Sequence, residues 1–93
     1  LSTFKVSNDS YQIEIVFSNI SDKNTFESLI EFLNKNLVVK EFSIKKFVTN
    51  TLTIEIESYG QVDQLLSSLL FYQNIDDIYF DRESNVIFSR LGT

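Results

Sequence analysis

The sequence predicts an α+β domain with the element order β-α-β-β-α-β. Apolar side chains alternate with polar ones in segments 11–17 and 52–57, which is typical of half-buried strands. In segments 26–36 and 62–70 they repeat with helical spacing instead. Short polar turns separate these segments, so we expect strands and helices to follow one another within one small domain.

The first strand and the first helix have clear signals. In segment 11–17 (YQIEIVF) one face carries Tyr11, Ile13, Ile15 and Phe17. The polar residues after it offer Ser21, Asp22 and Asn24 as helix caps, and Asn24 and Glu27 have the spacing of a capping box. The helix that follows has its apolar positions at Phe26, Leu29, Ile30 and Leu33.

The middle of the chain predicts a hairpin. Segment 38–48 alternates irregularly, with Phe42 and Ile44 on one face and Phe47 on the other, as expected for an edge strand or a bulged strand. The turn 49–51 is short enough to connect it directly to the strand 52–57. In that strand Leu52, Ile54 and Ile56 alternate with Thr53, Glu55 and Glu57.

The second helix and the end of the chain complete the pattern. Helix 62–70 has its apolar positions at Val62, Leu65, Leu66, Leu69 and Leu70. Segment 75–88 forms either one strand with a tail or a terminal hairpin around the polar turn 81–85.

This order predicts a ferredoxin-like βαββαβ sandwich: a four-stranded antiparallel sheet of strand order 4-1-3-2 with both helices on one face. Strands 11–17 and 52–57 should be central, and a terminal hairpin would add a further strand. Residues 1–93 fit a single domain, with 1–10 as a linker or a short edge strand. The chain contains no Met, so we expect it to be a piece of a longer protein.

Composition excludes several functions. The chain has no His and no Cys, which removes histidine general bases, thiolate nucleophiles and most zinc sites. It also has two Gly, too few for a phosphate-binding loop. The net charge is −5, so we expect no nucleic-acid binding. No apolar run approaches the roughly 20 residues of a membrane span, and we expect neither membrane insertion, nor a cofactor, nor enzymatic activity.

Two groups of carboxylates are candidate cation or acid–base sites. Glu14, Glu55 and Glu57 should share the sheet face opposite the helices, where paired carboxylates bind hard cations or divide their pKa values. A second group follows in Asp76, Asp77, Asp81 and Glu83. We favour the interpretation that both groups are hydrated surface.

Three apolar or aromatic positions are candidate interface residues. Alternation places Val16, Phe47 and Tyr79 away from the helices, with Phe47 on a predicted edge strand. An edge strand offers backbone groups to a partner strand. We therefore expect either a protein partner or self-association there, and the alternative is ordinary surface apolarity.

One further pattern extends over segment 15–75, about two thirds of the chain, and consists of Phe26, Leu29-Ile30, Phe32-Leu33, Val39, Phe42, Leu52-Ile54-Ile56 and Leu65-Leu66. In these residues the chain resembles a bacterial family known as a domain of unknown function, whose members are exported, envelope-associated proteins. Where the family usually has Gly before the first helix, this chain has Asn19. The resemblance implies a periplasmic or otherwise extracytoplasmic location and transfers no catalytic residue.

The sequence thus predicts a non-enzymatic protein–protein interaction or structural module of a bacterial envelope protein. The alternative is a regulatory domain that senses a ligand or cation on the acidic open face of its sheet.

Overall fold

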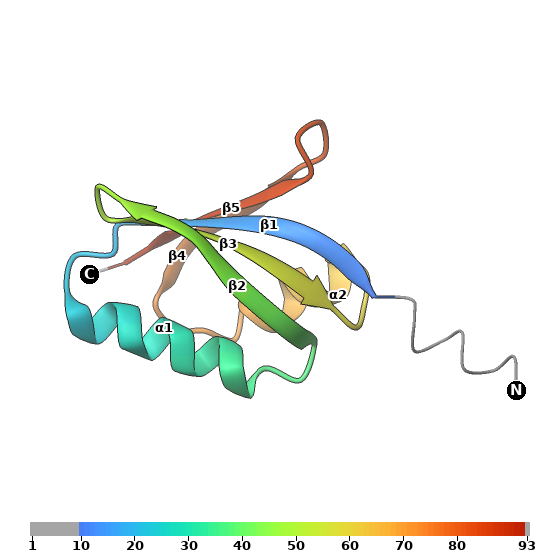
Figure 1. The fold of residues 1–93 in the computed structure, drawn as a ribbon, viewed down its shortest axis with the longest axis horizontal. Helices are drawn as coiled ribbons and strands as arrows, with labels where there is room; N and C mark the ends of the chain where they lie inside the picture. The colour runs from blue at the N-terminus through green and yellow to red at the C-terminus, as the bar shows by residue number, and fades with distance from the viewer. Residues whose placement is uncertain (1–9, 93) are drawn as a thin grey trace, which may run out of the picture.

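The alternating and helical segments form five strands and two helices in the computed structural model, which describes residues 10–92 (Figure 1). In chain order they are β1 (Tyr11–Ser18), α1 (Lys23–Lys35), β2 (Val39–Val48), β3 (Thr51–Ser58), α2 (Val62–Leu69), β4 (Ile75–Asp81) and β5 (Val86–Leu91). Apart from Ser10, the predicted linker or edge strand at residues 1–10 lies outside the described part of the chain.

Strict alternation makes β1 and β3 a central antiparallel pair, as predicted. Ile15 lies opposite Ile54, and Phe17 lies opposite Leu52. All four side chains are completely buried, because the helices cover this face of both strands. The α+β class and the pairing of these strands are therefore confirmed.

The two helices lie on the same side of the sheet, because buried leucines of both belong to the core on one sheet face. In Figure 1, α1 lies below the sheet and α2 lies partly behind its strands. α1 begins after Asp22, whose carboxylate accepts a hydrogen bond of 2.7 Å from the backbone N–H of Thr25. Of the three predicted caps, Asp22 is therefore confirmed, whereas the predicted capping box at Asn24 and Glu27 is wrong. α2 begins after Gln61, whose backbone N–H donates to Oε1 of Gln64 at 3.0 Å.

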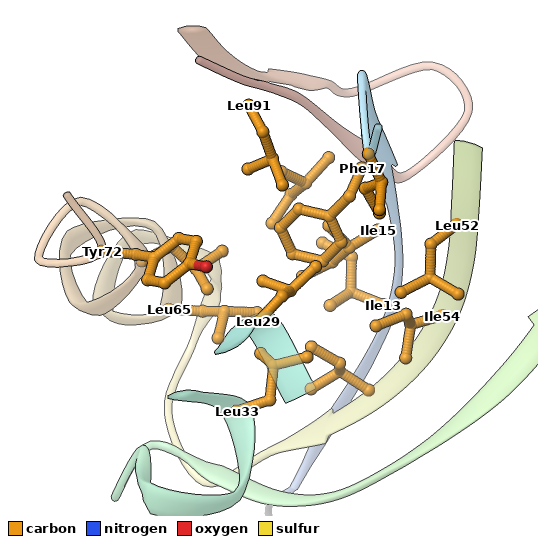
Figure 2. Close-up of a cluster of buried hydrophobic side chains, with 14 residues drawn as sticks. Ile13, Ile15, Phe17, Leu29, Leu33, Leu52, Ile54, Leu65, Tyr72 and Leu91 are labelled. Carbon is orange, nitrogen blue, oxygen red and sulfur yellow. The ribbon is translucent and has the colours of Figure 1, made fainter. Parts of the chain in front are cut away.

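The core fills the space between this sheet face and the helices. Figure 2 shows Ile13, Ile15 and Phe17 of β1 extending from the sheet toward the helices. The helices contribute four leucines with at most 1% exposure: Leu29, Leu33, Leu65 and Leu69. Burial of each such side chain contributes about 1.5–3 kcal/mol, so this layer is the main source of stability.

The prediction of a four-stranded antiparallel sandwich is wrong. The sheet has five strands in the order β2-β3-β1-β5-β4, and it is mixed because β5 runs parallel to β1. The chain reverses after β4, with Asn85 in the left-handed conformation at φ 59°, and β5 returns between β1 and β4. Of the two alternatives predicted for this segment, the terminal hairpin forms, but its second strand enters the sheet interior.

Side-chain chemistry explains which strand of this hairpin is inside. β5 carries Ile87 and Leu91, both completely buried against the core. β4 has three aspartates in seven residues, at Asp76, Asp77 and Asp81. An edge position leaves those carboxylates in water, whereas an interior position would bring more of them against neighbouring strands.

Candidate interaction surfaces

An apolar row crosses the sheet face that the helices leave open. Val16 of β1 lies opposite Thr53 of β3 on one side and opposite Phe88 of β5 on the other. Phe88 in turn lies opposite Tyr79 of β4. The rings of Phe88 and Tyr79 stack, with centroids 5.4 Å apart and planes at 25°. We call Thr53, Val16, Phe88 and Tyr79 the open-face row.

The open-face row ends in an exposed aromatic ring. Tyr79 is 58% exposed, Val16 and Phe88 are half-buried, and Thr53 is buried. A shallow hollow of about 180 Å³ lies over the row, lined by Val16, Ser18, Asp77, Tyr79, Phe88, Ser89 and Arg90. The predicted interface residues Val16 and Tyr79 are therefore brought together. Sequence reasoning missed Phe88, which alternation would have placed there if β5 had been recognised as an interior strand.

Phe47 lies on the opposite face from the one predicted. The register between β2 and β3 shifts at a bulge, because Ile44 is opposite Ile54 while Lys46 is opposite Thr53. The extra residue, Lys45, reverses the faces of the side chains that follow it. Phe47 consequently lies on the helix side, where its ring centroid is 5.5 Å from that of Phe26 in α1. The expectation of its face is wrong, and its role in an interface stays a prediction.

The open face also carries the predicted carboxylates, and two of them face lysines. Glu14 lies directly opposite Glu55 in the β1–β3 ladder. Lys45 Nζ is 3.0 Å from Oε1 of Glu14, and this hydrogen bond, with the negative charge of Glu14, raises the pKa of Lys45 above its ordinary value. The repulsion between Glu14 and Glu55 is thereby reduced by a lysine from the neighbouring strand.

Glu57 has two further partners at the other end of this face. The hydroxyl of Ser10 donates to Oε2 of Glu57, and Lys40 Nζ is 3.6 Å from the same oxygen. The Ser10 hydrogen bond lowers the pKa of Glu57, desolvation partly opposes it, and the charge of Lys40 lowers the pKa further. In residues 10–92, no group of three or more His, Cys, Asp or Glu side chains is placed to hold a metal ion.

The second acidic group is divided between two local contacts. Asp76 forms an ion pair with Arg90, with Oδ2 and Nη2 2.6 Å apart. Asp81 instead accepts hydrogen bonds from the backbone N–H of Glu83 at 3.2 Å and from the hydroxyl of Ser84 at 2.8 Å. These hydrogen bonds stabilise the β4–β5 turn. Asp76 and Asp81 thus have separate partners, and the second acidic group does not form one site.

No helix in the described part of the chain has both the length and the apolar character to cross a membrane. Comparison of the sequence and structure with protein-family models, curated proteins and solved structures finds no significant match. The resemblance to the family of unknown function is neither supported nor opposed by these comparisons, and it stays a prediction.

Proposed function

We propose that this domain is a non-enzymatic protein–protein interaction module that binds a partner protein through the open-face row. The observation that carries the proposal is the stacked pair of Tyr79 and Phe88 on the sheet face without helices. On the other face, the apolar side chains of the interior strands β3 and β5 and of β1 from Ile13 to Phe17 are buried between sheet and helices, whereas this aromatic pair faces outward.

The surroundings of the row fit a binding surface. Large aromatic side chains such as Tyr dominate binding energies at protein interfaces, and charged groups gather at the rim. Here Glu14 of β1 lies on one flank of the row. The ion pair between Asp76 of β4 and Arg90 of β5 lies on the other flank. An apolar centre with polar flanks is the arrangement expected of a small, specific contact.

The alternative of a cation-sensing domain receives no support from the contacts of the carboxylates. Lys45 lies against Glu14, and Lys40 lies against Glu57, so each of these two carboxylates already has a cationic neighbour.

The location of the protein in the bacterial envelope enters the proposal only through the predicted family resemblance. Binding through the open-face row does not depend on that location.

Photo-crosslinking in cells tests the proposal. A photoreactive phenylalanine analogue at position 79 should yield one dominant crosslinked protein, and the same analogue at Glu31, on the exposed side of α1, should not. A second change, Val16→Lys, places a charge in the row and should abolish the product from position 79. Equal products from positions 79 and 31, or a product that survives Val16→Lys in a folded domain, would contradict the proposal.

A further inference from the structure

The edge strand β2 is a second surface, separate from the open-face row. Among the described residues, β2 and β4 form the two edges of the sheet. β2 has ten residues, and Ile44, Phe47 and Val48 on it are 48%, 48% and 59% exposed. A long edge with exposed apolar side chains is the kind of strand that pairs with another chain.

The regular part of β2 is short. The β2–β3 register shifts between Val39 and Glu41 and again between Ile44 and Lys46. Bulges interrupt the flat edge that a further strand requires. Regular pairing with β3 runs from Glu41 to Ile44, and Lys45 is the extra residue of the second bulge, so the usable edge ends at Lys45. The partner strand must therefore complement this short segment.

We propose that the partner is a second copy of this chain, whose β2 pairs antiparallel with β2 about a two-fold axis at Ser43. In this register Glu41 of each copy lies opposite Lys45 of the other copy. Phe42 likewise lies opposite Ile44 of the other copy. The segment EFSIK is thus complementary to itself in both charge and apolar character.

The faces of these side chains agree with the register. Glu41 lies opposite Glu57 and Lys45 contacts Glu14, which places both on the open face. Phe42 and Ile44 lie opposite the buried Ile56 and Ile54, which places both on the helix side. Each pair across the axis would therefore meet on one face of a continuous ten-stranded sheet.

The other edge lacks this complementarity. A two-fold axis at Tyr79 of β4 would set Asp77 opposite Asp81 of the second copy, and like charges directly opposite one another are destabilising. Pairing of β2 with β4 of another copy would be head-to-tail and would produce rings of several copies or open polymers. The dimer through β2 differs from the β4–β4 dimer because it pairs opposite charges, and from β2–β4 pairing because it closes with two copies.

Variants that exchange the charges of Glu41 and Lys45 test the register. Analytical ultracentrifugation measures their dimer dissociation constants. The wild-type domain should form dimers, and Glu41→Lys or Lys45→Glu alone should raise the dimer dissociation constant at least about tenfold, or about 1.4 kcal/mol. The double variant Glu41→Lys/Lys45→Glu restores opposite charges across the axis and should return to within about threefold of wild type. Because Lys45→Glu removes the contact with Glu14 in the double variant too, recovery reports the contact between copies.

The matched controls lie on the far side of the sheet, in β4 and β5. Asp76→Lys and Arg90→Glu change the net charge as the two single variants do, and they should leave the dissociation constant unchanged. Far-UV circular dichroism establishes that every variant is folded. A monomeric wild type at about 1 mM, a ladder of larger polymers, or a double variant as weak as the singles would overturn the proposal.

A cysteine placed on the axis gives an independent measurement. The chain has no Cys, so Ser43→Cys introduces a single thiol at an exposed position. Residues directly opposite in antiparallel strands have Cα atoms about 4.5–5.5 Å apart, within the range of a disulfide. Mild oxidation should give covalent dimers much faster for Ser43→Cys than for Glu31→Cys on α1, and equal rates would overturn the register. Crosslinking from position 79 does not depend on this edge, so the two proposals can fail separately.

Discussion

Asn19 holds the loop between β1 and α1 in a left-handed conformation, with φ at 68°. Its side-chain Nδ2 also donates a hydrogen bond of 2.6 Å to the backbone carbonyl of Leu91, at the end of β5. Asn tolerates this conformation better than other residues with a Cβ atom. In the sequence, Asn19 stands where the resembled family usually has Gly, but the contact with Leu91 depends on a strand placement that the sequence did not reveal.

Two substitutions separate the roles of Asn19. Asn19→Gly retains the backbone conformation and loses the hydrogen bond, whereas Asn19→Ala loses the bond and strains the backbone. We expect Asn19→Ala to lower the free energy of unfolding by about 1 kcal/mol more than Asn19→Gly does. Urea denaturation of both variants measures the difference, and equal midpoints would show that the conformation of this residue does not limit stability.

The lowered pKa of Glu57 predicts a dependence of stability on pH. Because this carboxyl titrates at lower pH when folded than when unfolded, its contribution is present above the unfolded pKa and is lost as the pH falls through the folded pKa. Between about pH 5 and pH 3, wild type should lose more stability than Glu57→Gln. Urea titrations of wild type and Glu57→Gln across this range measure the difference, and equal losses of stability would contradict the prediction.

At the scale of the element, β2 shows what an alternating pattern cannot predict. The irregular alternation indicated an edge or bulged strand, and the structure has both features. It did not indicate where the extra residue lies, because Lys45 and Lys46 are equally polar and both tolerate the open face. Because the position of the bulge was not predicted, the predicted face of Phe47 was the wrong one. Ile54, in the strictly alternating β3, was placed on the correct face.

The turn between β2 and β3 has an unfavourable residue. Thr49 and Asn50 connect Val48 to Thr51 and have φ of 52° and 59°. This two-residue geometry suits Asn and Gly, whereas a β-branched residue is strained in it.

Thr49→Asn should therefore raise the free energy of unfolding by about 1 kcal/mol. The midpoint of urea denaturation measures this change. Far-UV circular dichroism is the probe, because the chain has no Trp for fluorescence. Thr51→Asn, one position into the strand, is the control and should give no stabilisation. A destabilising Thr49→Asn would mean that the threonine side chain contributes more than its conformation costs.

At the scale of the whole molecule, the topology differs from the predicted sandwich at one point. Helices, central strands and the first hairpin follow from local patterns, and these were recognisable in the sequence. The insertion of β5 between β1 and β4 depends on which strand of the last hairpin has the more buried side chains. Val86, Ile87 and Phe88 are all apolar, so periodicity in this short segment did not assign a face or a position.

Removal of β5 distinguishes the two topologies. In a four-stranded sandwich, a chain ending at Ser84 would retain every strand and remain folded. In the observed sheet it loses Ile87 and Leu91 from the core and leaves β4 without its neighbour. We expect this truncated chain to be unfolded by circular dichroism and by the dispersion of its amide NMR signals, and a cooperative thermal transition would contradict the expectation.

The adjacency of β1 and β5 also has a kinetic consequence. The pairing of these strands brings together residues that are about seventy positions apart, such as Val16 and Phe88. Contacts of such long range form slowly, because closing a large loop costs entropy before the contacts form. During synthesis β1 can pair with β3 but not with β5 until Leu91 has left the ribosome, so until then one side of β1 is an open edge, and we expect chaperones to bind the nascent chain at this stage.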